Sequence, residues 1–259
     1  MKKIKTGVVG YGFSAKIFQC PFIVAHKDFE LAAVVERSTN ESKKDYPMIT
    51  VYKDYMDLLK DDEIELVILS TPNHLHFEQA KLALEFNKHV LVEKPYTATY
   101  EEALELNELA KEKGKISLPY QNRRFDGDFL TIKKLVDDGV RIFEYEAVWD
   151  RFVHEVKGGW HEAGEPSNNL LYDLGPHYLD QALQLFGEPD EFYKIAHKLR
   201  ANTKIIDQIR ENDPNAKILI LGDFNDDPIN SSFKNILKTK RKKKNVGKND
   251  IYNPYEDLF

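Results

Sequence analysis

The chain has 259 residues, of which 42% are hydrophobic and 31% are charged, and its formal net charge is −6. This composition is typical of a soluble globular protein with one large domain or two modest ones, and no apolar run is long enough to span a bilayer. The single cysteine, Cys20, excludes an intrachain disulfide, and we expect a cytoplasmic protein.

Short apolar strands alternate with helical stretches through the first half of the chain. We predict strands over residues 4–10, 29–35, 49–52, 66–69 and 90–92, and helices over 77–86 and 100–113. Strands that alternate with helices predict a doubly wound α/β fold, in which right-handed crossovers join the strands of a parallel sheet. Gly114 is expected to end the second helix, as glycine commonly does at a helix C-terminus.

The turn after the first strand has a G-x-G-x-x-A pattern, which runs from Gly10 to Ala15. Gly10 permits a tight turn, Gly12 lets the backbone approach a pyrophosphate, and Ala15 keeps the next helix close to the sheet. The pattern follows a strand and opens a helix, which is its context in dinucleotide-binding proteins. The predicted cofactor contacts in this turn are Gly10, Gly12, Phe13, Ser14 and Ala15.

The second strand ends next to an acidic residue, Glu36, which lies 21 residues beyond Ala15. A carboxylate there can accept hydrogen bonds from the ribose hydroxyls of a dinucleotide. The following Arg37 could pair with a 2′-phosphate, but Glu36 would repel that group. We therefore expect NAD or NADP as cofactor, with NAD favoured.

Two further polar segments follow predicted strands, at residues 70–76 and 92–95. Ligands of open α/β sheets bind outside the carboxyl ends of the strands, where both segments are expected. Part of the first segment also suits a helix start, and a surface role stays open for His74 and His76. Lys94 would direct an ammonium group at the crevice. The predicted cofactor contacts here are Thr71, Pro72, Asn73, His76, Glu93 and Lys94.

A third polar group occurs further along, where Asp173 and His177 are four residues apart. On a helix the two would share a face, and a carboxylate beside an imidazole can orient the ring for acid–base work. Gly175 and Pro176 predict a helix start inside this span, followed by a helix over 178–186. The alternative is a histidine that packs beside a helix cap.

Together, the motifs Gly10-Tyr11-Gly12-Phe13, Thr71-Pro72-Asn73-His74, Glu93-Lys94-Pro95 and Asp173-Leu174-Gly175-Pro176-His177 resemble those of the Gfo/Idh/MocA oxidoreductases over residues 3–192. The resemblance implies a Rossmann domain and a second domain with a sugar or cyclitol pocket. It also implies that His177 is the general base, Asp173 its partner and Lys94 a proton-network residue. Arg123, Trp160 and His161 are the implied substrate contacts.

The family resemblance stops early, because only residues 140–152, 178–186 and 191–195 are expected to build the second domain. We therefore predict a Rossmann-like doubly wound parallel sheet, a truncated second α+β domain and a short non-homologous C-terminal segment. The predicted domains are a dinucleotide-binding domain at 1–122, a truncated substrate domain at 123–195 and a separate fragment at 196–259. A fusion of two gene fragments would explain this arrangement.

The last segment resembles the endonuclease/exonuclease/phosphatase superfamily. A predicted helix over 204–210 and a predicted strand over 217–221 precede Gly222-Asp223-Phe224-Asn225, and the resemblance implies that Asp223 activates water and Asn225 holds a phosphate. A Mg²⁺ site needs further carboxylates and a histidine, which we do not find in the sequence. We expect no metal site unless this fragment is active by itself.

Three functions are compatible with the sequence. The first is an NAD(P)-dependent oxidoreductase that acts on a sugar or cyclitol, the second is an inactive nucleotide-binding remnant, and the third is a metal-dependent phosphodiesterase. The basic run over 238–244 has no aromatic residue to stack on bases, so we expect no nucleic-acid partner and no membrane partner. A homo-oligomer stays open.

Overall fold

The structure, a computed structural model, describes residues 2–142, 145, 147, 170–189, 239–240 and 251–252. The chain divides into two compact units, residues 1–181 and residues 182–259. In the second unit, β7 (Thr239–Lys240) pairs in parallel with β8 (Ile251–Tyr252). The helix predicted over 204–210 and the strands predicted over 191–195 and 217–221 lie outside the described residues, as does most of 140–152.

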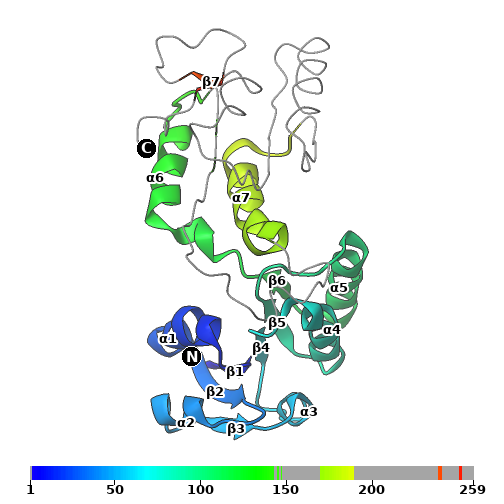
Figure 1. The fold of residues 1–259 in the computed structure, drawn as a ribbon. Helices are drawn as coiled ribbons and strands as arrows, with labels where there is room; N and C mark the ends of the chain where they lie inside the picture. Colours follow the sequence, from blue (N-terminus) through cyan, green and yellow to red (C-terminus); the bar gives the residue numbers. More distant parts are fainter. Residues whose placement is uncertain are drawn as a thin grey trace. The chain divides into compact units, whose positions relative to one another are not determined.

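The first unit is built on a six-stranded sheet, with every pair of neighbouring strands parallel (Figure 1). The strands lie in the order β3-β2-β1-β4-β5-β6, which confirms the predicted doubly wound, Rossmann-like sheet. Five of the strands were predicted, whereas β6 was not, since it is mostly exposed, ends in a proline and lacks the apolar run of a buried strand. The strands are β1 (Ile4–Val9), β2 (Phe29–Val35), β3 (Thr50–Tyr52), β4 (Leu66–Leu69), β5 (His89–Val92) and β6 (Ser117–Pro119).

Helices connect these strands and follow the last of them. The predicted helices correspond to α4 (His76–Glu85) and α5 (Tyr100–Lys113). The start of α5 is a capping box between Thr99 and Glu102, and Gly114 ends it with a φ of 61°. The other helices are η1 (Ala15–Gln19, a π-helix), α1 (Cys20–Ala25), α2 (Glu41–Asp45), α3 (Tyr55–Leu59), η2 (Asn73–Leu75), η3 (Asn122–Phe125), α6 (Gly127–Asp137) and α7 (Leu170–Phe186).

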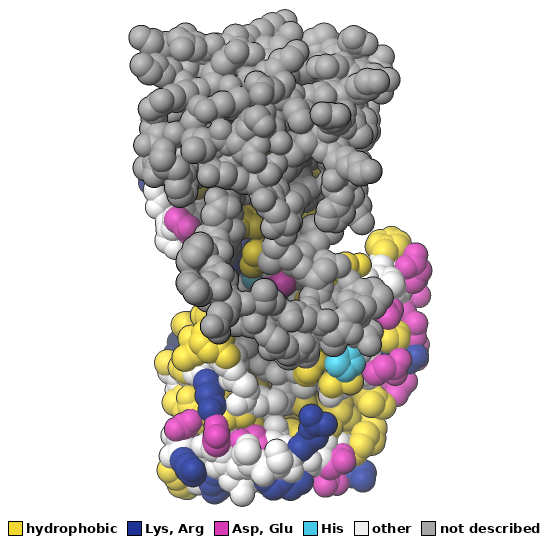
Figure 2. Space-filling view, viewed as in Figure 1, with side chains coloured by type: hydrophobic (Ala, Val, Ile, Leu, Met, Phe, Trp, Pro, Cys, Tyr) yellow, Lys and Arg dark blue, Asp and Glu magenta, His cyan; other side chains and the backbone are white. Residues whose placement is uncertain are grey.

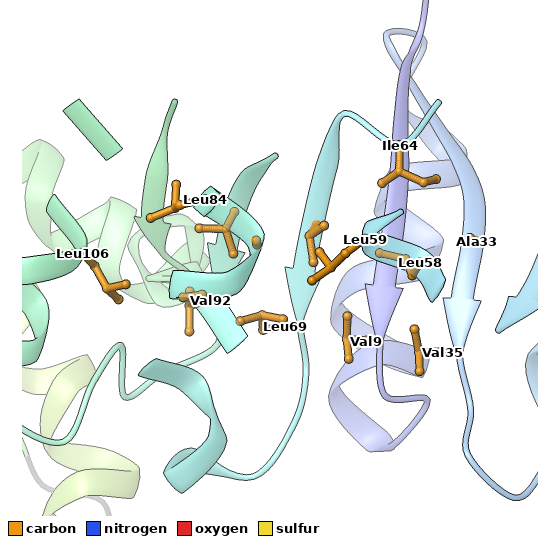
Figure 3. Close-up of a cluster of buried hydrophobic side chains, with 14 of the residues drawn as sticks. Val9, Ala33, Val35, Leu58, Leu59, Ile64, Leu69, Leu84, Val92 and Leu106 are labelled. Carbon is orange, nitrogen blue, oxygen red and sulfur yellow. The ribbon is translucent and has the colours of Figure 1, made fainter. Parts of the chain in front are cut away.

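The core follows from the period of two along each strand, which sends neighbouring side chains to opposite faces of the sheet. On β1, Val9 belongs to a cluster with Leu58 of α3 and Leu84 of α4, while Val8 packs in a second cluster that includes Ile23 of α1. The larger cluster is drawn in Figure 3. Because both faces of the sheet are covered, its strands read as continuous apolar runs.

Helix α7 differs from the prediction at its start. We expected Gly175 and Pro176 to open a helix, but α7 begins at Leu170 and has Pro176 inside it. A proline within a helix removes one backbone hydrogen bond. One turn earlier, the carbonyl of Asp173 accepts a hydrogen bond of 2.7 Å from the side chain of Lys94, so a tertiary contact supports this part of the helix.

Charged side chains of both signs are interspersed over the described part of the face in Figure 2. This distribution does not present a single-sign field on that face, of the kind that attracts nucleic acid. Within the ranges that the structure describes, no helix has the length and hydropathy that a membrane span requires.

Candidate functional site

In the sheet, β2 and β3 lie on one side of β1, whereas β4, β5 and β6 lie on the other. The loops that follow β1 and β4 therefore diverge at the carboxyl edge of the sheet. Gly10, in the first loop, has a φ of +90°, and a Cβ built on it would lie 2.6 Å from the carbonyl oxygen of Ser70 in the second. Both the backbone angle and this close approach require glycine. A Cβ built on Gly12 would meet nothing within 4 Å, so the space beside this residue is open.

The segment after the glycine turn is tied to the end of β5 by Glu93. Its carboxylate accepts hydrogen bonds from the hydroxyl of Ser14 and from Nε2 of Gln19, the latter at 2.8 Å. The structure therefore brings two predicted cofactor residues, Ser14 and Glu93, into direct contact. Ala15 is fully buried against the sheet, as predicted, and Phe13 is 74% exposed.

Glu36 lies at the end of β2, where it was predicted, but its carboxylate faces inward and is 5% exposed. Oε1 accepts hydrogen bonds from the Thr39 hydroxyl (2.6 Å) and the Glu41 amide (3.0 Å), and Oε2 accepts from the Ser42 amide (3.0 Å) and hydroxyl (2.5 Å). Burial alone would raise the pKa of Glu36, but these bonds outweigh it and lower the pKa. The carboxylate thus holds the start of α2, while Arg37 is exposed.

The loop after β4 is joined to the loop after β5 by His76, which is fully buried. Its Nδ1 lies 2.7 Å from the carbonyl oxygen of Pro95, and its Nε2 lies 2.9 Å from that of Thr71. Burial lowers the pKa of His76, and the two carbonyls oppose this shift. His76 therefore packs inside the protein, whereas His74 is exposed and Asn73 is 9% exposed. Pro72, which precedes Asn73, is partly exposed.

Lys94 and Asp173, which are far apart in the sequence, form an ion pair at the carboxyl end of β5. The ammonium group of Lys94 donates to Oδ1 of Asp173 and, at 2.7 Å, to the backbone carbonyl of the same residue. Lys94 comes from the loop after β5 and Asp173 from the first turn of α7. His177 follows one turn later on α7 and is 6% exposed.

Burial and the nearby positive charges keep the His177 imidazole neutral. Burial, then the positive charges of Lys94 and Arg123, lower the pKa of His177 to about 4, against the opposing effect of the Asp173 and Asp180 carboxylates. Within the described residues, the buried Nδ1 of His177 has no hydrogen-bond partner. The carboxylate of Asp173 pairs with the charged ammonium of Lys94, a stronger partner than a neutral imidazole. That Asp173 is the partner of His177 in catalysis stays a prediction.

Arg124 and Asp180, two residues of this region, were not among the predicted site residues. Arg124 and Asp180 form a two-point ion pair, with Nε 2.7 Å from Oδ2 and Nη2 2.5 Å from Oδ1. The signal for Asp180 is present in the sequence, since it follows His177 by three residues and Asp173 by seven and so shares their helical face. Arg123, a predicted substrate contact, donates to Asp126 at 2.8 Å. Trp160 and His161 lie outside the described residues.

In the part of the chain that the structure describes, no three acidic, histidine or cysteine side chains are grouped closely enough to hold a metal ion. Asp223 and Asn225, the predicted residues of the C-terminal fragment, lie outside that part. The described site therefore consists of loops at the carboxyl edge of the sheet and the first turns of α7, with one neutral imidazole and a lysine–aspartate pair.

Comparisons with known proteins agree with this geometry. Residues 4–120 match the Gfo/Idh/MocA family, described as an oxidoreductase family with an NAD-binding Rossmann fold. Residues 129–221 match the C-terminal domain of the same family, and residues 192–259 match the endonuclease/exonuclease/phosphatase family. The two C-terminal matches overlap over residues 192–221.

Similar proteins include the uncharacterized oxidoreductase YdgJ of Escherichia coli, which is 43% identical over 72% of this chain and 54% of its own length. The scyllo-inositol 2-dehydrogenase (NADP(+)) IolW of Bacillus subtilis is 38% identical over 79% of this chain and 58% of its own length. A solved oxidoreductase structure from Bacillus cereus has a TM-score of 0.64 at 38% identity and covers 72% of this chain and 54% of that one. The chain thus spans little more than half the length of these relatives.

Proposed function

We propose a function on the premise that residues 4–120 belong to the Gfo/Idh/MocA family of NAD-binding oxidoreductases. The function is the transfer of a hydride between a sugar or cyclitol carbon, as alcohol or ketone, and a nicotinamide cofactor. The observation that carries the proposal is the meeting of Lys94 and Asp173, with His177 one turn away, at the sheet edge that also holds the glycine turn. IolW, a relative that acts on scyllo-inositol, suggests the substrate class.

The residues at the glycine turn fit a dinucleotide. The open space beside Gly12 and the enforced turn at Gly10 leave room for a pyrophosphate next to backbone amides. Thr71, Pro72 and Asn73 on the neighbouring loop would line the nicotinamide half, beside Glu93 and Lys94. When bound, the nicotinamide would accept or return the hydride.

The remaining chemistry falls to side chains of this chain. In the direction of alcohol oxidation, the His177 imidazole would take the hydroxyl proton as the substrate C–H bond gives up its hydride and a carbonyl forms. Lys94, held by Asp173, would direct its ammonium charge at the substrate oxygen and stabilise the negative charge that develops there. Arg123, and by family resemblance Trp160 and His161, would hold other hydroxyl groups of the substrate.

For the choice between cofactors, we propose NADP rather than the NAD expected from the sequence. That expectation relied on Glu36 facing the ribose, whereas its two oxygens accept four hydrogen bonds from residues 39–42. A ribose diol would have to displace some of these bonds, whereas the exposed Arg37 is free to approach a 2′-phosphate. IolW, whose printed name specifies NADP(+), supports this choice.

Calorimetric titration of the full chain with NADH and NADPH tests the cofactor, and turnover on inositols and sugars tests the reaction. We expect tighter binding of NADPH, and an Arg37→Gln variant should reduce this preference by roughly tenfold, the loss of one charge-assisted phosphate contact. His177→Gln should abolish turnover and leave NADPH affinity unchanged. Absence of binding by either cofactor would reject the proposal.

Two alternatives would appear as distinct outcomes of these measurements. Binding of NADPH without turnover on any polyol would indicate a nucleotide-binding remnant. Mg²⁺-dependent phosphodiester cleavage without NADPH binding would favour the match at 192–259.

The division into domains at 1–122, 123–195 and 196–259 stays a proposal. A cytoplasmic location is also a proposal, and it is supported by the buried, free thiol of Cys20.

A further inference from the structure

Two carboxylates flank His177 on one face of α7. Asp173 precedes it by four residues and Asp180 follows it by three, and residues at these spacings are neighbours on a helix surface. Each carboxylate therefore starts from a position that suits a hydrogen bond to the imidazole. In the described part of the chain the buried Nδ1 of His177 has no hydrogen-bond partner, so neither carboxylate is bonded to this nitrogen.

Both carboxylates are instead held by cations from other elements. Lys94, after β5, holds Asp173, and Arg124 of η3 holds Asp180. The second contact is bidentate, at 2.7 and 2.5 Å, and Asp180 is 9% exposed. A planar guanidinium that binds both oxygens fixes the direction of a carboxylate as well as its position.

We propose that Arg124 is a positioning residue for His177, because it occupies both oxygens of Asp180 and so prevents this carboxylate from binding the imidazole. The inference rests on the proposed function, in which His177 is the general base. A carboxylate that accepts a hydrogen bond from an imidazole stabilises the protonated ring, which has no lone pair left to accept a substrate proton. Arg124 therefore extends to lower pH the range over which the imidazole of His177 keeps a free lone pair for the substrate proton.

The other charged groups that act on His177 do not replace this effect. Lys94 and Arg123 disfavour the protonated ring, and Asp173 favours it together with Asp180. Asp173 is already neutralised by Lys94 at the other end of the face. The contact with Arg124 thus determines whether Asp180, one turn beyond His177, can bind the imidazole.

The test is the titration of His177, followed by its ring signals in NMR spectra of the full chain without cofactor or substrate. In Arg124→Gln, Asp180 is released and the titration midpoint should rise by about one pH unit, as expected for a carboxylate brought next to an imidazole. Adding Asp180→Asn to this variant should return the midpoint close to the wild-type value. Lys133→Gln is the matched control, because it removes only the exposed ion pair with Asp137 on α6, and it should leave the midpoint unchanged.

An unchanged midpoint in folded Arg124→Gln would overturn the inference, and so would a rise that persists in the double variant. If Arg124→Gln does not fold, Arg124→Lys gives the same information, since lysine keeps the charge but loses the two-point contact and should produce a smaller rise. The titration needs neither cofactor nor turnover. A failure of the proposed function, seen as absent NADPH binding or absent turnover, is therefore distinguishable from a failure of this inference.

Discussion

The neutral, buried imidazole of His177 should make the stability of the protein depend on pH in a defined window. Its pKa in the folded chain is about 4, below the ordinary value of 6.5, and burial is the largest cause. When the pH falls below 6.5, the unfolded chain takes up a proton at this histidine while the folded chain does not. The contribution of His177 to the free energy of unfolding therefore decreases from pH 6.5 to about pH 4 and stays level below that.

The size of the effect follows from the difference between the two pKa values. At about 1.4 kcal/mol per pH unit, the loss attributable to His177 is on the order of 3 kcal/mol when the pH reaches 4. A loss of this size is a large fraction of the stability of an ordinary domain. It should be visible above the contributions of carboxylates, which are common to all variants of the chain.

The assay is urea denaturation at a series of pH values from 7 to 4, followed by circular dichroism, for the wild type and His177→Gln. Glutamine cannot titrate, so the variant should lose less stability across this window, although it starts from a lower value. Parallel curves for the two proteins between pH 6.5 and 4 would refute the reasoning, since they would mean that His177 binds its proton equally in the folded and unfolded chains.

Three further predictions concern the glycine turn and the C-terminal fragment. Gly12→Val should abolish binding of NADPH in calorimetry, because its side chain would fill the open space beside the turn; unchanged affinity would reject the cofactor site. Gly10→Ala should lower the free energy of unfolding by roughly 2–4 kcal/mol, from a φ of +90° and a Cβ 2.6 Å from the Ser70 carbonyl, and an unchanged urea midpoint would count against this strain. The full chain should show no Mg²⁺-dependent cleavage of DNA or phosphomonoesters above background; cleavage that disappears in Asp223→Ala would show instead that the fragment is an active hydrolase.

The sequence by itself determined the sheet and the place of the glycine turn. Strand and helix signals are local, since the apolar run in β2, the capping box at Thr99 and the C-terminal Gly114 each depend on a few adjacent residues. The predicted doubly wound sheet was confirmed for this reason. The path of α7 through Pro176 was predicted wrongly, because Gly175 and Pro176 are local signals for a helix start, whereas the turn that precedes them contacts Lys94, which is distant in sequence.

Only the tertiary structure decided which charged groups pair. The sequence places Glu36 after a strand and Asp173 four residues before His177, and both were expected to face a ligand or the imidazole. In the folded chain Glu36 binds residues 39–42, and Asp173 binds Lys94. A carboxylate goes to whichever donors and cations the fold brings within about 3 Å of it, and those partners come from loops and helices whose separation in space the sequence does not state.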